Sequence, residues 1–310
     1  MPRRPVASSI RGPAGRAADV SSNGVFHEGE LRVQQRAGLA DEALRLTRML
    51  GVREFSDAMS GFVAARDLAF VTSRDSAGTL WTSAVYGKPG FCRADRATLR
   101  VTGRPLAGDP LHELQDGAQI GLLFIDFRRR RRLRINGILT AVGDYGFEVT
   151  ADQAYGNCPQ YIRGRETGLA SATTAATPTV SHHVDAEPAH LEQISHADTF
   201  ILGTSHPSRG ADTSHRGGPG GFVRVEDGTL WWPDYPGNNL FNSMGNIAVE
   251  PAAALLFLDF GAGTSLQMSG TAQLDWDSPH LRDDEPPTGR RVRFTPGRTV
   301  HTTGLPLAAV

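Results

Sequence analysis

The second half of this chain repeats a pattern found in its first half. The run Gly121-Leu-Leu-Phe-Ile-Asp-Phe127 returns as Ala254-Leu-Leu-Phe-Leu-Asp-Phe260, and each copy is followed, after the same interval, by a segment that ends in glycine. These segments are Leu133–Gly137 and Leu266–Gly270, and two more pairs of blocks match upstream in the same order: Asp67–Ser73 with Asp198–Thr204, and Thr82 to Phe91 with Thr213 to Phe222. Matching blocks in constant order indicate a tandem duplication. The chain is therefore expected to fold as two copies of one unit.

The domain boundaries follow from length and local composition. The 310 residues suit two domains of ordinary size better than one core. Residues 166–188 are rich in Thr, Ala, Ser and Pro and are predicted to be a flexible linker. This predicts an N-terminal extension with a helix over 1–48, a first domain over 49–165, and a second over 189–310 that ends in a pocket segment. About the first two dozen residues are expected to be disordered.

Within each unit the local pattern is mostly that of β-strands. Short β-branched and aromatic runs are separated by Gly, Pro, Asp and Asn, which is typical of a small antiparallel barrel. The predicted strands cover 68–73, 79–85, 98–101, 119–127, 131–142 and 147–150, then 200–204, 221–225, 229–232, 253–260 and 265–276. A few short helices are predicted over 41–50, 55–66, 110–115 and 241–250.

Composition excludes several classes of function. The formal net charge of −1 gives no general attraction to nucleic acid, and no apolar run is long enough to span a membrane. Two cysteines build neither a disulfide framework nor a four-thiolate site, and paired-His or CxxC spacings are missing, so no metal is predicted. The N-terminus lacks the apolar stretch of a secretory signal, and a cytoplasmic protein is expected.

The densest charge feature is a run of arginines after an apolar strand. Arg128 to Arg132 are all arginine, and Arg134 follows. Strand alternation places Arg132, Arg134 and Asn136 on one face and Leu133 and Ile135 on the other. Guanidinium binds phosphate in a bidentate manner, so Arg131, Arg132 and Arg134 are candidate ligands of a phosphate group. The alternative is a solvated hairpin tip or a patch for acidic partners.

The second unit carries a complementary polar cluster. Ser214, His215 and Arg216 precede Gly217, which lets a backbone approach a ligand closely. Between a predicted strand and a short helix lie four polar residues suited to a phosphate, namely Asp234, Asn238, Asn239 and Asn242. The alternative is a turn rich in Asn and Gly for backbone reasons alone. The matching stretch of the first unit, residues 103–111, has prolines and lacks paired asparagines.

Cys158 is a further candidate functional residue. Close to it in sequence lie Tyr155, Tyr161, Arg163 and Arg165. Nearby cations favour a reactive thiolate, whereas a buried cysteine acts as a small hydrophobe. Tyr155, Cys158 and Tyr161 are candidate substrate-pocket residues, with Cys158 shaping the pocket and not attacking covalently.

Three segments of the second unit carry a family resemblance. Ser214-His-Arg-Gly-Gly218, the loop from Trp232 to Asn242, and Ala254–Phe260 together resemble the pyridoxamine 5'-phosphate oxidase-like superfamily of FMN-binding split barrels. The first unit looks like a diverged copy, and its segment from Asp152 to Tyr161 resembles a signature of the tandem branch. The resemblance covers roughly residues 50–300.

The resemblance implies a fold and a function. The fold class is mainly β with a few short helices, as two tandem split β-barrels that form an intrachain pseudo-dimer. Two barrels of this superfamily hold flavin in their interface, and the strand at Arg131–Leu133 reaches the flavin on the partner barrel. One well-formed site is therefore expected from the arginine strand and the second unit's loops, with a degenerate counterpart.

The predicted function is an FMN-dependent oxidoreductase acting on a small organic substrate, of which a biosynthetic tailoring oxidation is one example. A haem- or deazaflavin-binding split-barrel enzyme and a non-catalytic flavin-binding module are the alternatives. A homodimer of such pseudo-dimeric chains is compatible with this prediction. In the predicted oxidoreductase the flavin, and not a protein side chain, carries the redox chemistry.

Overall fold

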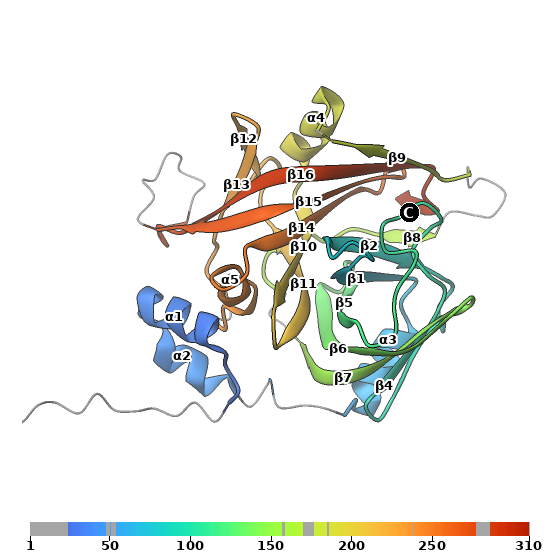
Figure 1. Cartoon of the computed structure of the whole chain (residues 1–310), viewed down its shortest axis with the longest axis horizontal. Helices are drawn as coiled ribbons and strands as arrows, with labels where there is room; N and C mark the ends of the chain where they lie inside the picture. Colours follow the sequence, from blue (N-terminus) through green and yellow to red (C-terminus); the bar gives the residue numbers. More distant parts are fainter. Residues whose placement is uncertain are drawn as a thin grey trace, which may run out of the picture.

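Two antiparallel sheets with the same strand order form the molecule (Figure 1). The structure is a computed structural model and describes residues 24–47, 50, 54–156, 159–169, 177–184, 186–237, 239–276 and 286–309. The first sheet has seven strands in the order β2-β1-β5-β6-β7-β4-β3, and the main path of the second is β11-β10-β14-β15-β16-β13-β12. Each strand of one sheet thus has a counterpart at the same place in the other.

The strands of the first sheet are β1 Leu68–Arg74, β2 Leu80–Tyr86, β3 Cys92–Asp95, β4 Thr98–Thr102, β5 Gln119–Asp126, β6 Arg131–Gly143 and β7 Gly146–Gly156. Those of the second are β10 Thr199–His206, β11 Gly210–Gly217, β12 Arg224–Glu226, β13 Thr229–Pro233, β14 Ala252–Asp259, β15 Thr264–Asp275 and β16 Arg291–Thr303. The predicted fold class, mainly β in two tandem split barrels, is confirmed.

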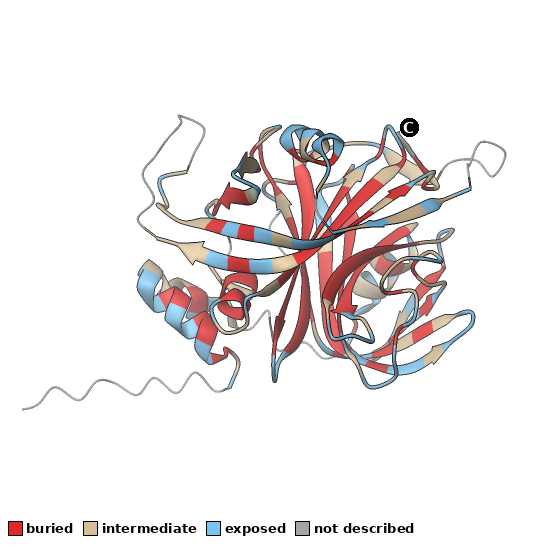
Figure 2. Cartoon of the chain, turned by 45° about the horizontal axis from the view of Figure 1, so that its top comes forward, coloured by how far each residue is buried: buried red, intermediate tan, exposed pale blue. Residues whose placement is uncertain are grey.

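The repeated apolar run forms the strand that each barrel buries on both faces. In β5, Leu122 and Phe124 pack into the core of the first barrel, whereas Leu123 packs into a cluster shared by the two barrels. In β14, Leu255 packs into the second core and Leu256 into the shared cluster. A strand covered on both sides needs a continuous hydrophobic run rather than an alternating one. This is the physical reason for the motif repeated at 121–127 and 254–260, and Figure 2 shows buried residues continuing through the centre of the molecule.

The glycine that ends the second repeated block has the same role in both sheets. Gly137 lies at an irregularity between β6 and β7, and Gly270 lies at one between β15 and β16. A Cβ on Gly137 would lie 2.1 Å from the Thr150 carbonyl oxygen, and a Cβ on Gly270 would lie 2.1 Å from that of Thr295. Only glycine permits so close an approach of the neighbouring strand.

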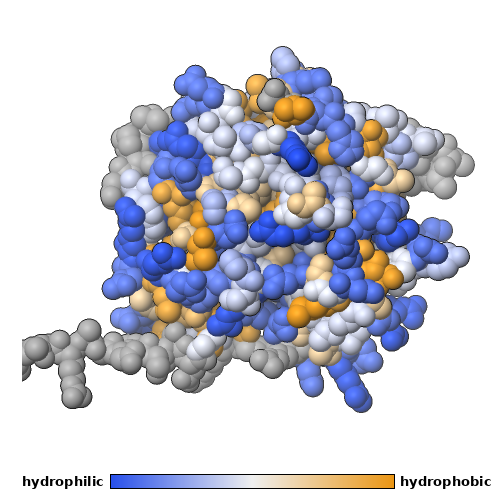
Figure 3. Space-filling model, in the orientation of Figure 1, coloured by the Kyte–Doolittle hydropathy of each residue, from blue (hydrophilic) through white to orange (hydrophobic). Residues whose placement is uncertain are grey.

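Five helices are described, and they are short: α1 Glu28–Ala37, α2 Ala40–Arg45, α3 Asp57–Ala64, α4 Pro188–His196 and α5 Asn242–Ile247. Within the part of the chain that the structure describes, no helix combines the length and apolarity needed to cross a membrane. In Figure 1, α1 and α2 lie beside α5 at the edge of the second barrel. Figure 3 shows a largely hydrophilic surface on this side of the molecule, broken by small hydrophobic patches.

Several local predictions were wrong. The strand expected over 221–225 is displaced, because β11 occupies Gly210–Gly217 and only the short β12 follows. The stretch 110–115 forms turns and bends instead of a helix. The predicted linker contains two strands, β8 Thr167–Leu169, which pairs with β17 Leu307–Ala309, and β9 Thr179–His183, which pairs with β16. The N-terminal extension has two helices rather than one, and residues 1–23 lie outside the described residues.

Candidate functional site

A pocket lies between the two barrels, at the start of β6 and the end of β11. It is lined by residues from β6 and β7 of the first barrel and by β11, β13, the following loop and α5 of the second. The polar or charged lining residues include Arg132, Arg134, Gln160, His215, Arg216, Asp234, Asn239, Asn242, Ser243 and Arg290. The aromatic ones are Tyr155, Tyr161, Phe222, Trp232, Tyr235 and Phe241.

The arginine strand contributes two side chains to this pocket from one face of β6. Arg132 Nη1 donates to His215 Nδ1 at 3.1 Å and to the His215 carbonyl oxygen at 3.3 Å. Arg134 is only 8% exposed, and its Nη1 donates to both carboxylate oxygens of Asp212 at 3.2 Å. Between them, Leu133 points the other way into the first core. Strand alternation therefore separates the two arginines from the apolar core and carries them across the interface.

His215 is held neutral and in one tautomer. Burial, together with the charges of Arg132 and Arg216, holds the pKa of His215 well below its ordinary value. Because a guanidinium only donates hydrogen bonds, Nδ1 of His215 is the acceptor for Arg132. The proton is then on Nε2, which lies 3.1 Å from Thr199 Oγ1. A neutral His215 leaves the arginines as the cations on this side of the pocket.

Cations outnumber carboxylates in the described lining. Asp212 pairs with Arg134, and Asp234 accepts from Arg290 Nε at 2.8 Å. Arg216 adds a further guanidinium, whose buried Nε has no hydrogen-bond partner among the described residues. Burial lowers the pKa of Arg216, while Asp234 nearby opposes that effect. An anion that accepts hydrogen bonds would satisfy this group, since buried donors without partners are costly.

Strained backbone gathers at the same pocket. Six described non-glycine residues have a positive φ, and three of them line the pocket: Tyr161 at 68°, Asn239 at 58° and Phe241 at 57°. The rings of Tyr161 and Tyr235 stack with their centroids 4.9 Å apart. Non-glycine residues in the left-handed region are uncommon and cluster at ligand sites. The strain therefore marks this pocket as a candidate site independently of its charge.

The N-terminal extension supports the pocket from behind through α5. A Cβ on Gly29 of α1 would lie 2.1 Å from the Gly245 carbonyl oxygen, so the two helices touch backbone to backbone. Ser243 Oγ donates to Asp212 Oδ2 at 3.0 Å, and Asn242 Nδ2 donates to Glu30 Oε1 at 3.0 Å. Asp212, Ser243 and Glu30 are thus residues at or behind the site that the sequence analysis missed.

Burial raises the pKa of Glu30 to about 7 from 4.5. The folded protein therefore holds this proton to higher pH than the unfolded chain, and the free energy of unfolding falls as pH rises from 4.5 through about 7. In a Glu30→Gln variant the new amide can donate to Asn242 Oδ1 once the Asn242 amide has rotated, since Asn242 now presents its Nδ2 to Glu30 Oε1. We expect this variant to be more stable by about 2–3 kcal/mol above about pH 7, and not below pH 4.5. Chemical denaturation across this pH range measures the difference.

Glu28→Gln is the matched control, because Glu28 lies on the same helix and is exposed. It should give no stabilisation above about pH 7. A Glu30→Gln variant with an unchanged pH profile would show that Glu30 ionises normally in the folded protein.

The remaining predicted residues are placed as follows. Arg131 is exposed, lies outside this pocket and has its guanidinium 5.6 Å from the Phe62 ring centroid. Ser214 is buried behind the pocket, 3.0 Å from Ser243 Oγ, and Gly217 lines the pocket. Tyr155 and Tyr161 line the pocket, whereas Asn238 and Cys158 lie outside the described residues. Of the predicted C-terminal pocket segment, Arg290 reaches the pocket, and residues from Arg291 onward form β16.

The counterpart position on the other side of the interface is filled by side chains. The repeat aligns Gln267 of β15 with Arg134 of β6. Gln267 is 1% exposed, and its Nε2 lies 2.9–3.1 Å from three possible acceptors, the Thr82 carbonyl oxygen, Ser83 Oγ and Asp109 Oδ2. A neutral glutamine held by partners inside the protein therefore stands where β6 has Arg134.

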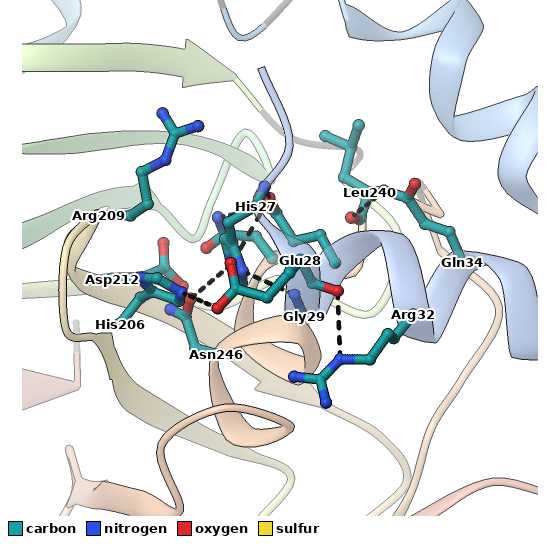
Figure 4. A network of polar contacts seen from close by, with 12 residues as sticks. His27, Glu28, Gly29, Arg32, Gln34, His206, Arg209, Asp212, Leu240 and Asn246 are labelled. Carbon is teal, nitrogen blue, oxygen red and sulfur yellow. Dashed lines mark hydrogen bonds and ion pairs between the residues drawn. The ribbon is translucent and has the colours of Figure 1, made fainter. Parts of the chain in front are cut away.

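A second polar cluster, near α1, contains three groups with metal-ligand chemistry (Figure 4). His27, Glu28 and His206 have ligand atoms within 4.8 Å of one another. However, Nδ1 of His27 accepts from the Gly29 amide, and Nδ1 of His206 accepts from the Ser208 amide. Each Nε2 then carries the proton, which leaves neither ring nitrogen with a lone pair for a metal ion. The cluster instead caps α1 and ties it to the second barrel.

Comparisons with known proteins give matches among solved structures alone. No protein-family model matches the sequence, and no curated protein matches it. HupZ from Group A Streptococcus is 10% identical and matches 37% of this chain and 92% of its own chain, with a TM-score of 0.31. A putative pyridoxamine 5'-phosphate oxidase from Lactobacillus delbrueckii is 13% identical over 38% of this chain and 94% of its own, with a TM-score of 0.31. One from Corynebacterium glutamicum is 14% identical over 41% and 94%, with a TM-score of 0.28. The chain is thus similar, over well under half of its length, to proteins that include two described as putative pyridoxamine 5'-phosphate oxidases.

Proposed function

We propose that this chain is an FMN-dependent oxidoreductase that holds one FMN in the pocket between its barrels. The observation that carries the proposal is the buried Arg216 Nε without a described partner, in a pocket that Arg132 and Arg134 also line. A phosphate monoester is a dianion with several acceptor oxygens, which suits a group of guanidiniums. The aromatic wall formed by Trp232, Tyr161 and Tyr235 suits a flat ring system next to that phosphate.

The chain's own residues would hold and orient the cofactor. Arg132 and Arg216 would bind the phosphate, while Asp212 keeps Arg134 in place through its two hydrogen bonds. Asn239 and Asn242 offer amide groups at the rim of the same pocket. When bound, FMN supplies the redox chemistry, and the protein supplies orientation and a shaped substrate pocket.

The geometry of His215 bears on the haem alternative. A haem iron needs an axial ligand, and His215 is the one histidine that lines the described pocket. Its Nδ1 accepts from Arg132, and its Nε2 lies within hydrogen-bond distance of Thr199. Both nitrogens of His215 are therefore engaged, so this histidine is not available as an axial ligand of haem iron. A deazaflavin that carries a phosphate would bind to the same arginines. Its absorption spectrum distinguishes it from FMN.

The cofactor assignment is tested by reconstituting the purified chain separately with FMN, riboflavin, haem and a deazaflavin. FMN should bind roughly ten- to a hundred-fold more tightly than riboflavin, because one charge-assisted hydrogen bond to phosphate contributes about 1.5–3 kcal/mol. Fluorescence quenching and the absorption spectrum measure this. Equal affinity for FMN and riboflavin would contradict the proposal that the arginines bind the phosphate. Tighter binding of haem or of the deazaflavin would assign that molecule as the cofactor in place of FMN. Substrate-dependent change in the bound flavin's absorbance separates an enzyme from a storage module.

A further inference from the structure

A second cavity, of about 410 Å³, adjoins the proposed flavin pocket on the far side of Asp212. The two share Asn242 as a lining residue. Asp212 lines the second cavity and bonds to Arg134, which lines the first. One ion pair therefore separates the two spaces.

The floor of this cavity is buried and rich in acceptor groups. Glu30, Asn136 and Asp212 are 3%, 6% and 1% exposed, respectively. The Oδ1 atoms of Asn136 and Asn242 are buried and have no hydrogen-bond partner among the described residues. Asn136 lies on the same face of β6 as Arg132 and Arg134, because it follows them at alternate positions. A buried acceptor without a donor is costly, so the cavity suits a ligand that brings N–H groups.

The charged residues of the cavity also suit a ligand that brings N–H groups. Three carboxylates line it, namely Glu30, Asp152 and Asp212, and Arg209 is the one arginine in its described lining. Arg209 is exposed and donates to the carbonyl oxygen of Gly24. Asp212 is already paired, which leaves Asp152 and, when it is ionised, Glu30 to face a ligand, because burial raises the pKa of Glu30 to about 7. This lining contrasts with the arginines of the neighbouring pocket.

We propose that this cavity is a binding site for a small organic cation, such as a primary ammonium or amidinium compound. The acceptors Asn136, Asn242 and Glu30 would take its N–H groups, and Asp152 would contribute charge at the exposed rim. The N-terminal extension forms part of the wall through Gly24, His27 and Glu30, so it belongs to the site. If the flavin function proposed above holds, this cation would be the substrate. Its binding to the cavity does not depend on that function.

The test uses three probes of similar length and different charge: putrescine, butanediol and succinate. Calorimetry on the full chain, with and without FMN, should show putrescine binding at least about tenfold more tightly than the other two. Asp152→Asn, at the exposed rim, and Asn136→Leu, at the floor, should each weaken putrescine binding roughly tenfold. Glu113→Gln, an exposed change elsewhere, is the control and should have no effect.

Three results would overturn the proposal: putrescine binding no tighter than succinate or butanediol, absence of measurable binding of any probe, or putrescine affinity unaffected by both variants. Because Asp152 is exposed, its substitution tests the site even if the Asn136 variant fails to fold. Putrescine binding in protein that does not take up FMN would support this site and contradict only the flavin function. FMN binding without putrescine binding would support the flavin function and contradict the cation site.

Discussion

Replacing Asp212 with alanine should lower the free energy of unfolding by about 3–5 kcal/mol, because it leaves Arg134 charged and buried without its partner. Asp212 is 1% exposed and accepts two hydrogen bonds from Arg134 and one from Ser243. These bonds join β6 of the first barrel to β11 and α5 of the second. The loss should therefore appear in denaturant unfolding of the whole chain.

Two further variants distinguish the cost of breaking the buried Arg134–Asp212 ion pair from the cost of removing any carboxylate. Glu148→Ala removes an exposed partner of Arg100 and should cost no more than about 1 kcal/mol. Combining Asp212→Val with Arg134→Met should recover much of the stability, since the uncompensated buried charge is then removed. Equal costs for Asp212→Ala and Glu148→Ala would show that Arg134 is solvated in the folded protein.

Replacing Arg216 with glutamine, or Arg132 with alanine, should weaken FMN binding roughly ten- to a hundred-fold each. Each change removes a guanidinium that lines the pocket, and with it a charge-assisted hydrogen bond worth about 1.5–3 kcal/mol. Titration of flavin fluorescence measures the dissociation constant.

Arg128→Ala is the matched control, because Arg128 belongs to the same arginine run but is exposed at the hairpin. Its effect on FMN affinity should be negligible. Equal and small effects at positions 128, 132 and 216 would restore the interpretation of the arginine run as a solvated hairpin tip.

The fold was predictable where burial leaves a hydrophobic signature. The runs at 121–127 and 254–260 are apolar because β5 and β14 are covered on both faces, so the repeat was visible in the sequence. β11 was missed because its sequence from Gly210 to Gly217 is polar, although seven of its eight residues are buried. The Thr213 hydroxyl donates to the Gly121 carbonyl oxygen of the other barrel and lies 2.8 Å from the Thr72 hydroxyl. Polar groups satisfied across an interface leave no hydrophobic pattern to detect.

The site was predictable only in part, from the alternation of side chains along β6. Strand alternation picked out Arg132 and Arg134, and both line the interface pocket. Arg131 lies outside this pocket, and alternation places it on the opposite face of β6, with Leu133 and Ile135. Asp212 and Ser243 could not be inferred, because each acts through contacts with residues far away in the sequence. The role of Glu30 depends on the packing of α1 against α5, for which the pair Gly29 and Gly245 is the one local signal.

The stoichiometry of FMN binding tests the central claim most directly. Calorimetric titration of the flavin-free full chain should give one FMN per chain, because Arg132, Arg134 and Arg216 line one side of the interface while Gln267 fills the other. Arg216→Gln should weaken that single site. Two equivalent sites per chain would contradict the asymmetry between the barrels, and a chain that takes up no FMN would contradict the flavin function itself.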